Sequence, residues 1–541
     1  MFINFSDLPG QHNLFLDYLY EFDNVRKYYK KNFRDENSFN ETIEQLTKKT
    51  PSHRERLSEI IKLQYETLTP SRQTLNNIAA LKESNTLAIV TGQQLGLYGG
   101  PLYSFYKIIT AIKLCQFLKQ KYDSYSFVPV FWLEGDDHDF DEVRSVNLID
   151  ENNDLIRLIY DDELTEETNR GSVGKIKFNK NITELNSELN KVLRNNDYKA
   201  TLMEKLTSFY KEGKTFKEAF KSLILELFDE YGLVIFDPQD YEVKKLLRPV
   251  FRKEIEDFSI HTKDLVKVSA DLEEIYHAQV KINPVNLFLS DSDGRFLIEP
   301  AETDFRLKGK RKRITKAALL EILENEPERY SANVILRPIC QDFLFPTLAY
   351  VGGPGEISYF AQIIPMYAKF GITQPIIYPR SSVSLLEKNV LKIIDKYNLS
   401  HFDLFSERDP LHEKVIKQQT DIEIDKEFAE CMKEMTSTLK NLNKKLSSID
   451  NTLDDAVSKT KEKIEHSLKL LKDRTNEAQK KKYEISIRQI NKVSNLLYPN
   501  SNLQERELPY IYFAHKYGMD FLKKIYDEIS IDSFEHQLIQ I

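Results

Sequence analysis

The chain has 541 residues, of which 41% are hydrophobic and 30% charged, the balance of a globular protein with roughly three or four domains and a sizeable core. Its 17 glycines and 19 prolines exclude a fibrous or low-complexity protein, and its net charge of −8 argues against a nucleic-acid partner. No apolar run approaches the ~20 residues of a membrane span, the first residues do not resemble a signal peptide, and the three cysteines lie far apart, so we expect a cytoplasmic protein without membrane contact or disulfides.

The first two thirds of the chain show the pattern of an α/β protein. Residues 1–85 are charged and periodic, and we expect an N-terminal helical segment packed on the core. In residues 86–384, short apolar runs alternate with helical segments such as 103–121, which predicts a parallel sheet covered on both faces. The predicted strands are 87–90, 127–133, 233–236, 334–336, 347–351 and 376–378.

Two insertions interrupt this predicted sheet, near 144–232 and 260–330. The first begins with short strands and turn signals and continues as helices. The second contains a hairpin around the turn sequence DSDG at 291–294. It also holds the run 306–313, in which six of eight residues are Lys or Arg. We interpret this run as a solvated loop, with contact to phosphate or RNA as the alternative.

Residues 385–502 are predicted to form a helical coiled-coil domain. Residues 411–498 contain neither Gly nor Pro. Apolar residues spaced alternately by four and three form a heptad seam, namely Phe428, Met432, Met435, Leu439, Leu442, Leu446, Ile449 and Leu453. We expect two antiparallel helices, about 423–447 and 455–496, that pair with a second copy in a homodimer. Residues 503–541 have globular composition, and we expect this tail to dock on the core.

A glycine-rich segment, TGQQLGLYGGPLY at 91–103, lies between the first predicted strand and the following helix. Glycines here allow close backbone approach to a ligand, and a helix start offers free N–H groups to an anion. The alternative is a tight turn that binds nothing. The residues we expect in a binding site are Gln93, Gln94, Gly99, Gly100 and Tyr103.

An acidic segment, EGDDHDFDE at 134–142, follows the most apolar strand and has six carboxylates in nine residues. So many like charges need a cation, a basic ligand or full solvation. We expect Asp136 to bind substrate, and Asp137 and His138 to be catalytic, because a histidine among carboxylates can act as acid or base near neutral pH. The alternative is a solvated acidic loop.

Two later segments complete the candidate site. RPICQD at 337–342 precedes a strand that ends in GGPGE at 352–356, and YPRSS follows at 378–382. We expect the loops at 92–100, 134–142 and 352–356 to line one crevice at the carboxyl edge of the sheet. For Ser381 or Ser382, capping of a helix is the alternative. The binding residues expected from these segments are Gln341, Asp342, Gly353, Gly355, Glu356, Arg380 and Ser382.

Over its whole length the chain resembles the BshC family of cysteine-adding enzymes of bacillithiol biosynthesis. The resemblance rests on four ordered segments, TGQQLGLYGGPLYSFYK, FWLEGDDHDFDEV, RPICQDFLFPTLAYVGGPGEISYFAQ and YPRSSVSLLE. It implies a Rossmann-like core of the nucleotidyltransferase type and a coiled coil used for dimerisation. It also implies a ligase that joins L-cysteine to glucosaminyl-malate by an amide bond, the last step of the pathway.

This chemistry suits the candidate residues. The glycine-rich loops could hold an anion, the segment 136–138 could bind an amine or take its proton, and Arg380 could neutralise malate or phosphate. The HIGH and KMSKS signatures of nucleotidyltransferases are absent in their usual form. The activating co-substrate is therefore unknown, and a nucleotide is consistent with the fold that the resemblance implies. We assign no metal ligands, and metal binding at 134–142 remains an alternative.

Two functions from other classes compete with the ligase. One is a metal-dependent hydrolase that uses the acidic segment. The other is a non-catalytic adaptor built on the coiled coil. The ligase predicts small-molecule partners, L-cysteine and glucosaminyl-malate.

Overall fold

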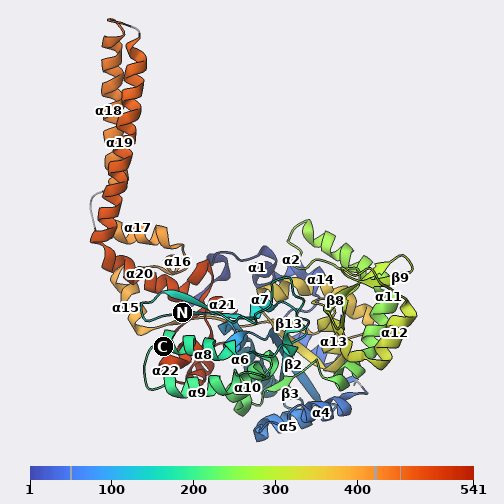
Figure 1. Cartoon of the computed structure of the whole chain (residues 1–541). Helices are drawn as coiled ribbons and strands as arrows, with labels where there is room; N and C mark the ends of the chain where they lie inside the picture. The colour runs from blue at the N-terminus through green and yellow to red at the C-terminus, as the bar shows by residue number, and fades with distance from the viewer. Residues whose placement is uncertain (49–51, 420–422, 451) are drawn as a thin grey trace. The chain divides into compact units, whose positions relative to one another are not determined.

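The structure is a computed structural model that describes residues 1–48, 52–419, 423–450 and 452–541 (Figure 1). The chain forms two compact units. The first contains residues 1–385 and 502–539, and the second contains residues 386–501 and 540–541. Among the described residues, no helix is both long and apolar enough to cross a bilayer.

The first unit is built on a five-stranded parallel sheet, which confirms the predicted α/β core. Its central strands are buried on both faces over most of their length, and each contains a run of apolar residues. Helices α6 (Leu102–Lys121) and α14 (Pro354–Phe370) each follow a strand and pack on the sheet. In spatial order the strands are β13 (Ile376–Pro379), β12 (Thr347–Gly352), β2 (Thr86–Gln94), β3 (Ser126–Glu134) and β6 (Val234–Phe236).

The strand register brings the candidate segments together. Gln94 at the end of β2 lies opposite Glu134 at the end of β3. Gly352 at the end of β12 lies opposite Pro379 in β13. The segments that follow these strands therefore leave the sheet at the same edge.

Residues 334–336 are not the predicted strand. They form a turn that leads into helix α13 (Arg337–Leu344). The side-chain oxygen of Asn333 accepts the backbone N–H groups of Ile335 and Leu336, both at 3.0 Å, and Pro338 lies in the first helical turn. Ile335 and Leu336 are buried at this helix start, and so short an apolar run does not distinguish a helix start from a strand.

Arg380 lies between two strands, not between a strand and a helix as predicted. Residues Ser382–Leu386 form β14, so Ser381 and Ser382 do not cap a helix. The next helix, α15 (Lys388–Lys396), has Glu387 as its N-cap residue. β14 joins a small sheet with β15 (His536–Gln540), which pairs antiparallel with β1 (Phe2–Ile3).

Helices precede the core sheet, as expected for the N-terminal part. A strand, β1, comes before them and was not predicted. The helices are α1 (Asn13–Tyr20), α2 (Phe22–Tyr29), α3 (Glu36–Lys48), α4 (Arg54–Leu63) and α5 (Arg72–Ala80).

The first insertion follows the short helix α7 (Phe140–Val143) and is an antiparallel hairpin followed by helices, as predicted. The hairpin turns within residues 150–154, where Asn153 has a positive φ. Its elements are β4 (Ser145–Ile149), β5 (Leu155–Ile159), α8 (Asn181–Val192), α9 (Lys199–Phe209) and α10 (Phe216–Phe228).

The second insertion is a five-stranded antiparallel sheet that follows the 33-residue helix α11 (Tyr241–Glu273) and also contains α12 (Lys316–Asn325). The basic run 306–313 belongs to its edge hairpin. Three of its basic side chains form ion pairs: Arg306 lies 3.1 Å from Glu299, Lys310 lies 2.5 Å from Asp291, and Arg313 lies 2.8 Å from Glu302. The strands are β7 (Leu287–Asp291), β8 (Gly294–Ala301), β9 (Asp304–Leu307), β10 (Arg313–Ile314) and β11 (Tyr330–Ala332).

Residues 503–539 of the C-terminal tail belong to the first unit. The N–H of Leu102, at the start of α6, donates to the carbonyl of Leu508 at 2.9 Å. The tail therefore lies beside the glycine-rich segment. Its helices are α21 (Gln504–Glu507), α22 (Tyr510–Tyr517) and α23 (Phe521–Glu528).

The second unit contains the predicted helical hairpin. Helices α18 (Ile424–Leu446) and α19 (Leu453–Lys482) lie side by side (Figure 1), and Lys472 reaches Asp425 at 2.5 Å. The turn lies between them as expected, although residue 451 is outside the described residues. The returning arm is interrupted at Tyr483, where α20 (Glu484–Leu497) begins. The shorter helices are α16 (His401–Leu404) and α17 (Arg408–Gln419).

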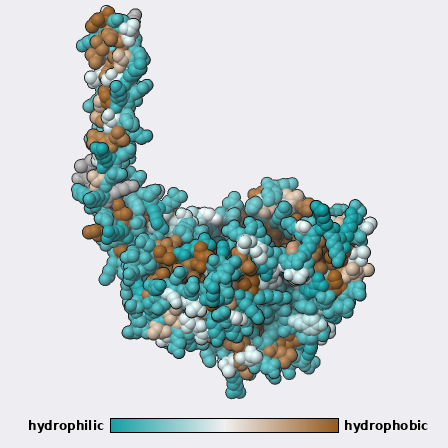
Figure 2. All heavy atoms as spheres, viewed as in Figure 1, coloured by the Kyte–Doolittle hydropathy of each residue, from teal (hydrophilic) through white to brown (hydrophobic). Residues whose placement is uncertain are grey.

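Part of the predicted heptad seam stays exposed. Phe428, Met432, Met435, Leu439 and Leu446 are partly buried in the hairpin. Leu442 and Ile449, in contrast, are 46% and 77% exposed. Figure 2 shows apolar residues between hydrophilic ones along the hairpin. One hairpin therefore covers only some of its own apolar residues.

Candidate functional site

A pocket of about 660 Å³ opens at the carboxyl edge of the parallel sheet. Three of the predicted segments line it, through Gln93 and Gln94, through Asp137 and His138, and through residues 353–356. This confirms that the three loops meet at one crevice. Gly99 and Gly100 do not line it: the N–H of Gly99 donates to the Tyr210 hydroxyl at 3.1 Å in a buried turn.

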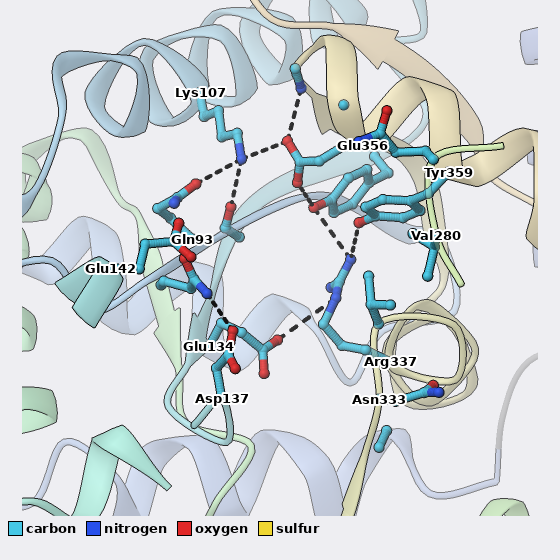
Figure 3. Close-up of a pocket in the computed structure, with 18 of the residues that line it drawn as sticks. Gln93, Lys107, Glu134, Asp137, Glu142, Val280, Asn333, Arg337, Glu356 and Tyr359 are labelled. Carbon is cyan, nitrogen blue, oxygen red and sulfur yellow. Dashed lines mark hydrogen bonds and ion pairs between the residues drawn. The ribbon is translucent and has the colours of Figure 1, made fainter. Parts of the chain in front are cut away.

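A buried ion pair forms one wall of the pocket (Figure 3). Lys107 of α6 has a side chain only 5% exposed, and its Nζ lies 2.5 Å from Oε2 of Glu356. The same Nζ donates to the carbonyl of Gly92 at 3.1 Å and to Oε1 of Gln93 at 2.9 Å. Burial raises the pKa of Glu356, but the Lys107 ammonium outweighs this and holds that pKa below its usual value. Lys107 thus links the ends of β2 and β12.

The ion pair continues into a network around Arg337. The Tyr350 hydroxyl donates to Oε1 of Glu356 at 2.5 Å. Arg337 donates to the Tyr359 hydroxyl at 3.0 Å, and its Nε lies 3.7 Å from Oε2 of Glu134 (Figure 3). Arg337 also donates to the Tyr350 hydroxyl at 3.4 Å, so its guanidinium connects Glu134 with the tyrosine that binds Glu356.

Glu134 ends β3 and faces the pocket. Its Oε2 accepts the indole N–H of Trp132 at 3.1 Å. Burial raises the pKa of Glu134 to about 7, although Arg337 opposes this shift. The side chain is 20% exposed, so a ligand in the pocket can reach it.

Asp137 is held firmly by its surroundings. Gln94 donates to its Oδ2, and its Oδ1 accepts the backbone N–H of His138 at 2.6 Å. Burial raises the pKa of Asp137, but the contacts with His138 and Gln94 outweigh it and bring the pKa well below the usual value. Asp137 is therefore ionised at neutral pH.

His138 lies at the rim of the pocket, and its side chain is 60% exposed. Its Nδ1 is 3.3 Å from Oδ1 of Asp137 and 3.2 Å from Nη1 of Arg295. Arg295 comes from β8 of the second insertion and stacks on the ring of Phe288 at 3.6 Å. The insertion thus contributes a wall to the pocket.

Arg380 is fixed by the C-terminal tail. Its Nη2 lies 2.6 Å from Oε1 of Glu505, and both side chains are buried. The same Glu505 oxygen accepts the hydroxyl of Ser382 at 2.8 Å. Ser382 also contacts His536 and lies away from the pocket. The neighbouring Arg506 lines the pocket.

Other predicted binding residues divide between the pocket and the core. Tyr103, Gly353, Gly355, Glu356 and Arg380 line the pocket, as do Gln93 and Gln94. Asp136 instead pairs with buried Lys244 at 2.5 Å. Gln341 accepts from Arg337, and Asp342 accepts the Tyr367 hydroxyl at 2.6 Å. Asp136, Gln341 and Asp342 therefore do not line the pocket and contact other protein residues instead.

Several residues that line the pocket were not predicted from the sequence. Lys107 lies four residues after Tyr103, on the same face of a helix, so helical spacing could have identified it. Arg337 is the first residue of the segment 337–342, from which only Gln341 and Asp342 were predicted to bind substrate. Arg295 and Phe288 lie in the second insertion, and no local pattern marks them.

In the described parts of the chain, no three His, Cys, Asp or Glu side chains are grouped closely enough to hold a metal ion.

Comparison with known protein families identifies the chain. The N-terminal Rossmann-like domain of bacillithiol biosynthesis BshC matches residues 1–381, and the C-terminal coiled-coil domain of BshC matches residues 383–541. The chain belongs to the BshC family. The fold class given by these two domains agrees with the parallel sheet and the helical hairpin described above.

Relatives in the BshC family match over nearly their full length. A protein of Salinibacter ruber is 34% identical over 531 residues, 98% of this chain and 96% of the relative. One of Chloroherpeton thalassium is 32% identical over 529 residues, 95% of this chain and 93% of the relative. One of Bacillus cytotoxicus is 27% identical over 482 residues, 88% of each. Each is named "Putative cysteine ligase BshC". The chain is accordingly an enzyme of the ligase class.

Proposed function

We propose that this BshC family member joins the carboxyl group of L-cysteine to the amine of glucosaminyl-malate, forming the amide bond of bacillithiol. The supporting observation is the mixed charge of the pocket. Arg295, Arg337, Arg380 and Arg506 line it together with Glu134, Asp137 and Glu356. Such a site suits one zwitterionic amino acid and one substrate that carries both an amine and carboxylates.

Amide formation requires an activated carboxyl group, a neutral amine and stabilisation of the developing oxyanion. We assign the cations of the pocket to the malate carboxylates and to the oxyanion. We place His138, with ionised Asp137 beside it, at a proton transfer of the reaction other than deprotonation of the amine. We assign no identity to the compound that activates the cysteine carboxyl group.

Deletion of the gene tests this function in the bacterium that carries it. We expect loss of bacillithiol and accumulation of glucosaminyl-malate in a profile of small thiols and their precursors, and restoration of both by the wild-type gene. Unchanged bacillithiol in the deletion strain would contradict the proposed ligase reaction.

We also propose that two copies pair through the helical hairpin. Leu442, Ile449, Leu470, Leu471 and Ile485 are between 46% and 77% exposed in the second unit. Burial of such residues is worth about 1.5–3 kcal/mol per side chain. A second copy has the same apolar surface, and twofold symmetric pairing would bury both surfaces against each other.

Charged residues at this surface should shift the protein towards monomer. We expect wild-type protein to scatter light as a dimer at micromolar concentration, and the double variant Leu442→Glu, Leu470→Glu to scatter as a monomer. Leu63→Glu is the matched control, because Leu63 is 57% exposed on α4 of the first unit. Monomeric wild-type protein, or dimeric double variant, would show that the hairpin does not mediate dimerisation.

A further inference from the structure

Glu134 differs from the other carboxylates deep in the pocket in what it contacts. Glu356 is bound by Lys107 and Tyr350, and Asp137 by Gln94 and two backbone N–H groups. Among the described residues, the hydrogen bond to the Glu134 carboxylate comes from the indole N–H of Trp132 and the ion pair comes from Nε of Arg337, both at Oε2. Its Oε1 is thus left with acceptor capacity for a ligand.

We propose that Glu134 is the general base that removes a proton from the ammonium group of the amine substrate. The inference rests on the proposed amide-forming function. One proton passes from the ammonium nitrogen to a carboxylate oxygen of Glu134, and the nitrogen keeps the electron pair of the broken N–H bond. That pair then attacks the activated carboxyl carbon of cysteine and forms the C–N bond. The nitrogen loses its second proton to solvent, and the activating group leaves with the electron pair of its bond to the carboxyl carbon. Glu134, now neutral, returns the proton to solvent.

The surroundings of Glu134 support this role. Arg337 from α13 and Arg295 from β8 favour its charged form, whereas Asp136 and Asp137 from the following loop favour its neutral form. With burial the balance gives a pKa of about 7, close to the value at which a base both accepts and releases a proton efficiently at neutral pH. The hydrogen bond from Trp132 holds the carboxylate at the pocket wall.

The test compares Glu134→Gln with wild-type protein. A glutamine side-chain oxygen can still accept the Trp132 N–H, so the fold should persist, which circular dichroism checks. Both proteins are added to extract of the deletion strain, which supplies the activating compound, with glucosaminyl-malate and isotopically labelled cysteine. At pH 7 we expect the variant to form labelled bacillithiol about 10²–10⁴-fold more slowly.

The pH dependence of the ratio of the Glu134→Gln rate to the wild-type rate shows whether Glu134 acts as a general base. A general base is needed only while the substrate amine is protonated, so the ratio should rise as the pH passes the pKa of that amine. A ratio that does not change with pH, or equal rates at pH 7, would overturn the proposal. Absence of labelled product with wild-type protein would instead refute the proposed function.

Two further variants keep the test decisive. Glu134→Asp retains a carboxylic acid at altered reach, so it should be slower than wild type but faster than Glu134→Gln. If Glu134→Gln does not fold, a wild-type rate for Glu134→Asp would overturn the proposal. Glu142→Gln removes the exposed carboxylate at the pocket rim. If the ratio of variant rate to wild-type rate depends on pH for Glu142→Gln but not for Glu134→Gln, the proposed role of Glu134 is wrong.

Discussion

Replacement of Lys107 with methionine should destabilise the protein by about 3–5 kcal/mol, because it leaves the Glu356 carboxylate without its cation in a buried site. Methionine fills most of the lysine volume, so the loss of charge dominates over the loss of packing. Urea unfolding of the variant and of wild-type protein measures the difference. Bacillithiol formation should fall as well, since Lys107 also holds Gln93 and the backbone of Gly92 at the pocket.

The double variant Lys107→Met, Glu356→Gln is the control. It removes both charges, so its stability should recover part of the loss caused by Lys107→Met alone. A Lys107→Met protein as stable as wild type would show that the pair contributes little. If the double variant loses more unfolding free energy than the two single variants lose together, Lys107 and Glu356 do not stabilise each other directly.

His138→Ala and Asp137→Asn should each lower the rate of bacillithiol formation by about 10²–10⁴-fold, the usual effect of removing a positioned acid or base. The fold should survive, because the His138 side chain is 60% exposed and its removal leaves no core cavity. Complementation of the deletion strain and circular dichroism measure the two effects.

His277→Ala is the matched control for His138. This histidine is similarly exposed, at 69%, and lies outside the pocket. We expect wild-type activity from it. Wild-type activity of His138→Ala would show that His138 takes no part in the reaction, and an unfolded variant would show that His138 is structural.

The core sheet could be predicted because its strands are short, nearly continuous apolar runs followed by glycine or charge. The run 127–133 corresponds to β3 with one residue more at each end. The same criterion wrongly predicted a strand at 334–336, because Asn333 and Pro338 place this similar apolar run at the start of a helix. Local composition does not separate these two outcomes.

The candidate site was predictable only where the chain keeps its polar residues at strand ends. Gln93 and Gln94 end β2, and Asp137 and His138 come shortly after β3. The parallel register brings them together. Arg295 and Arg506 reach the pocket from an insertion and from the tail. Their positions depend on tertiary contacts between distant segments, which leave no spacing pattern in the sequence.

Formation of labelled bacillithiol by the purified protein tests the proposed ligase reaction most directly. Extract of the deletion strain, supplied with glucosaminyl-malate and isotopically labelled cysteine, should form labelled bacillithiol only when the wild-type protein is added. Mass spectrometry follows the label, and the Lys107→Met variant should form much less of the product. Extract that forms no labelled bacillithiol with folded wild-type protein, or forms it equally without the protein, would contradict the assignment.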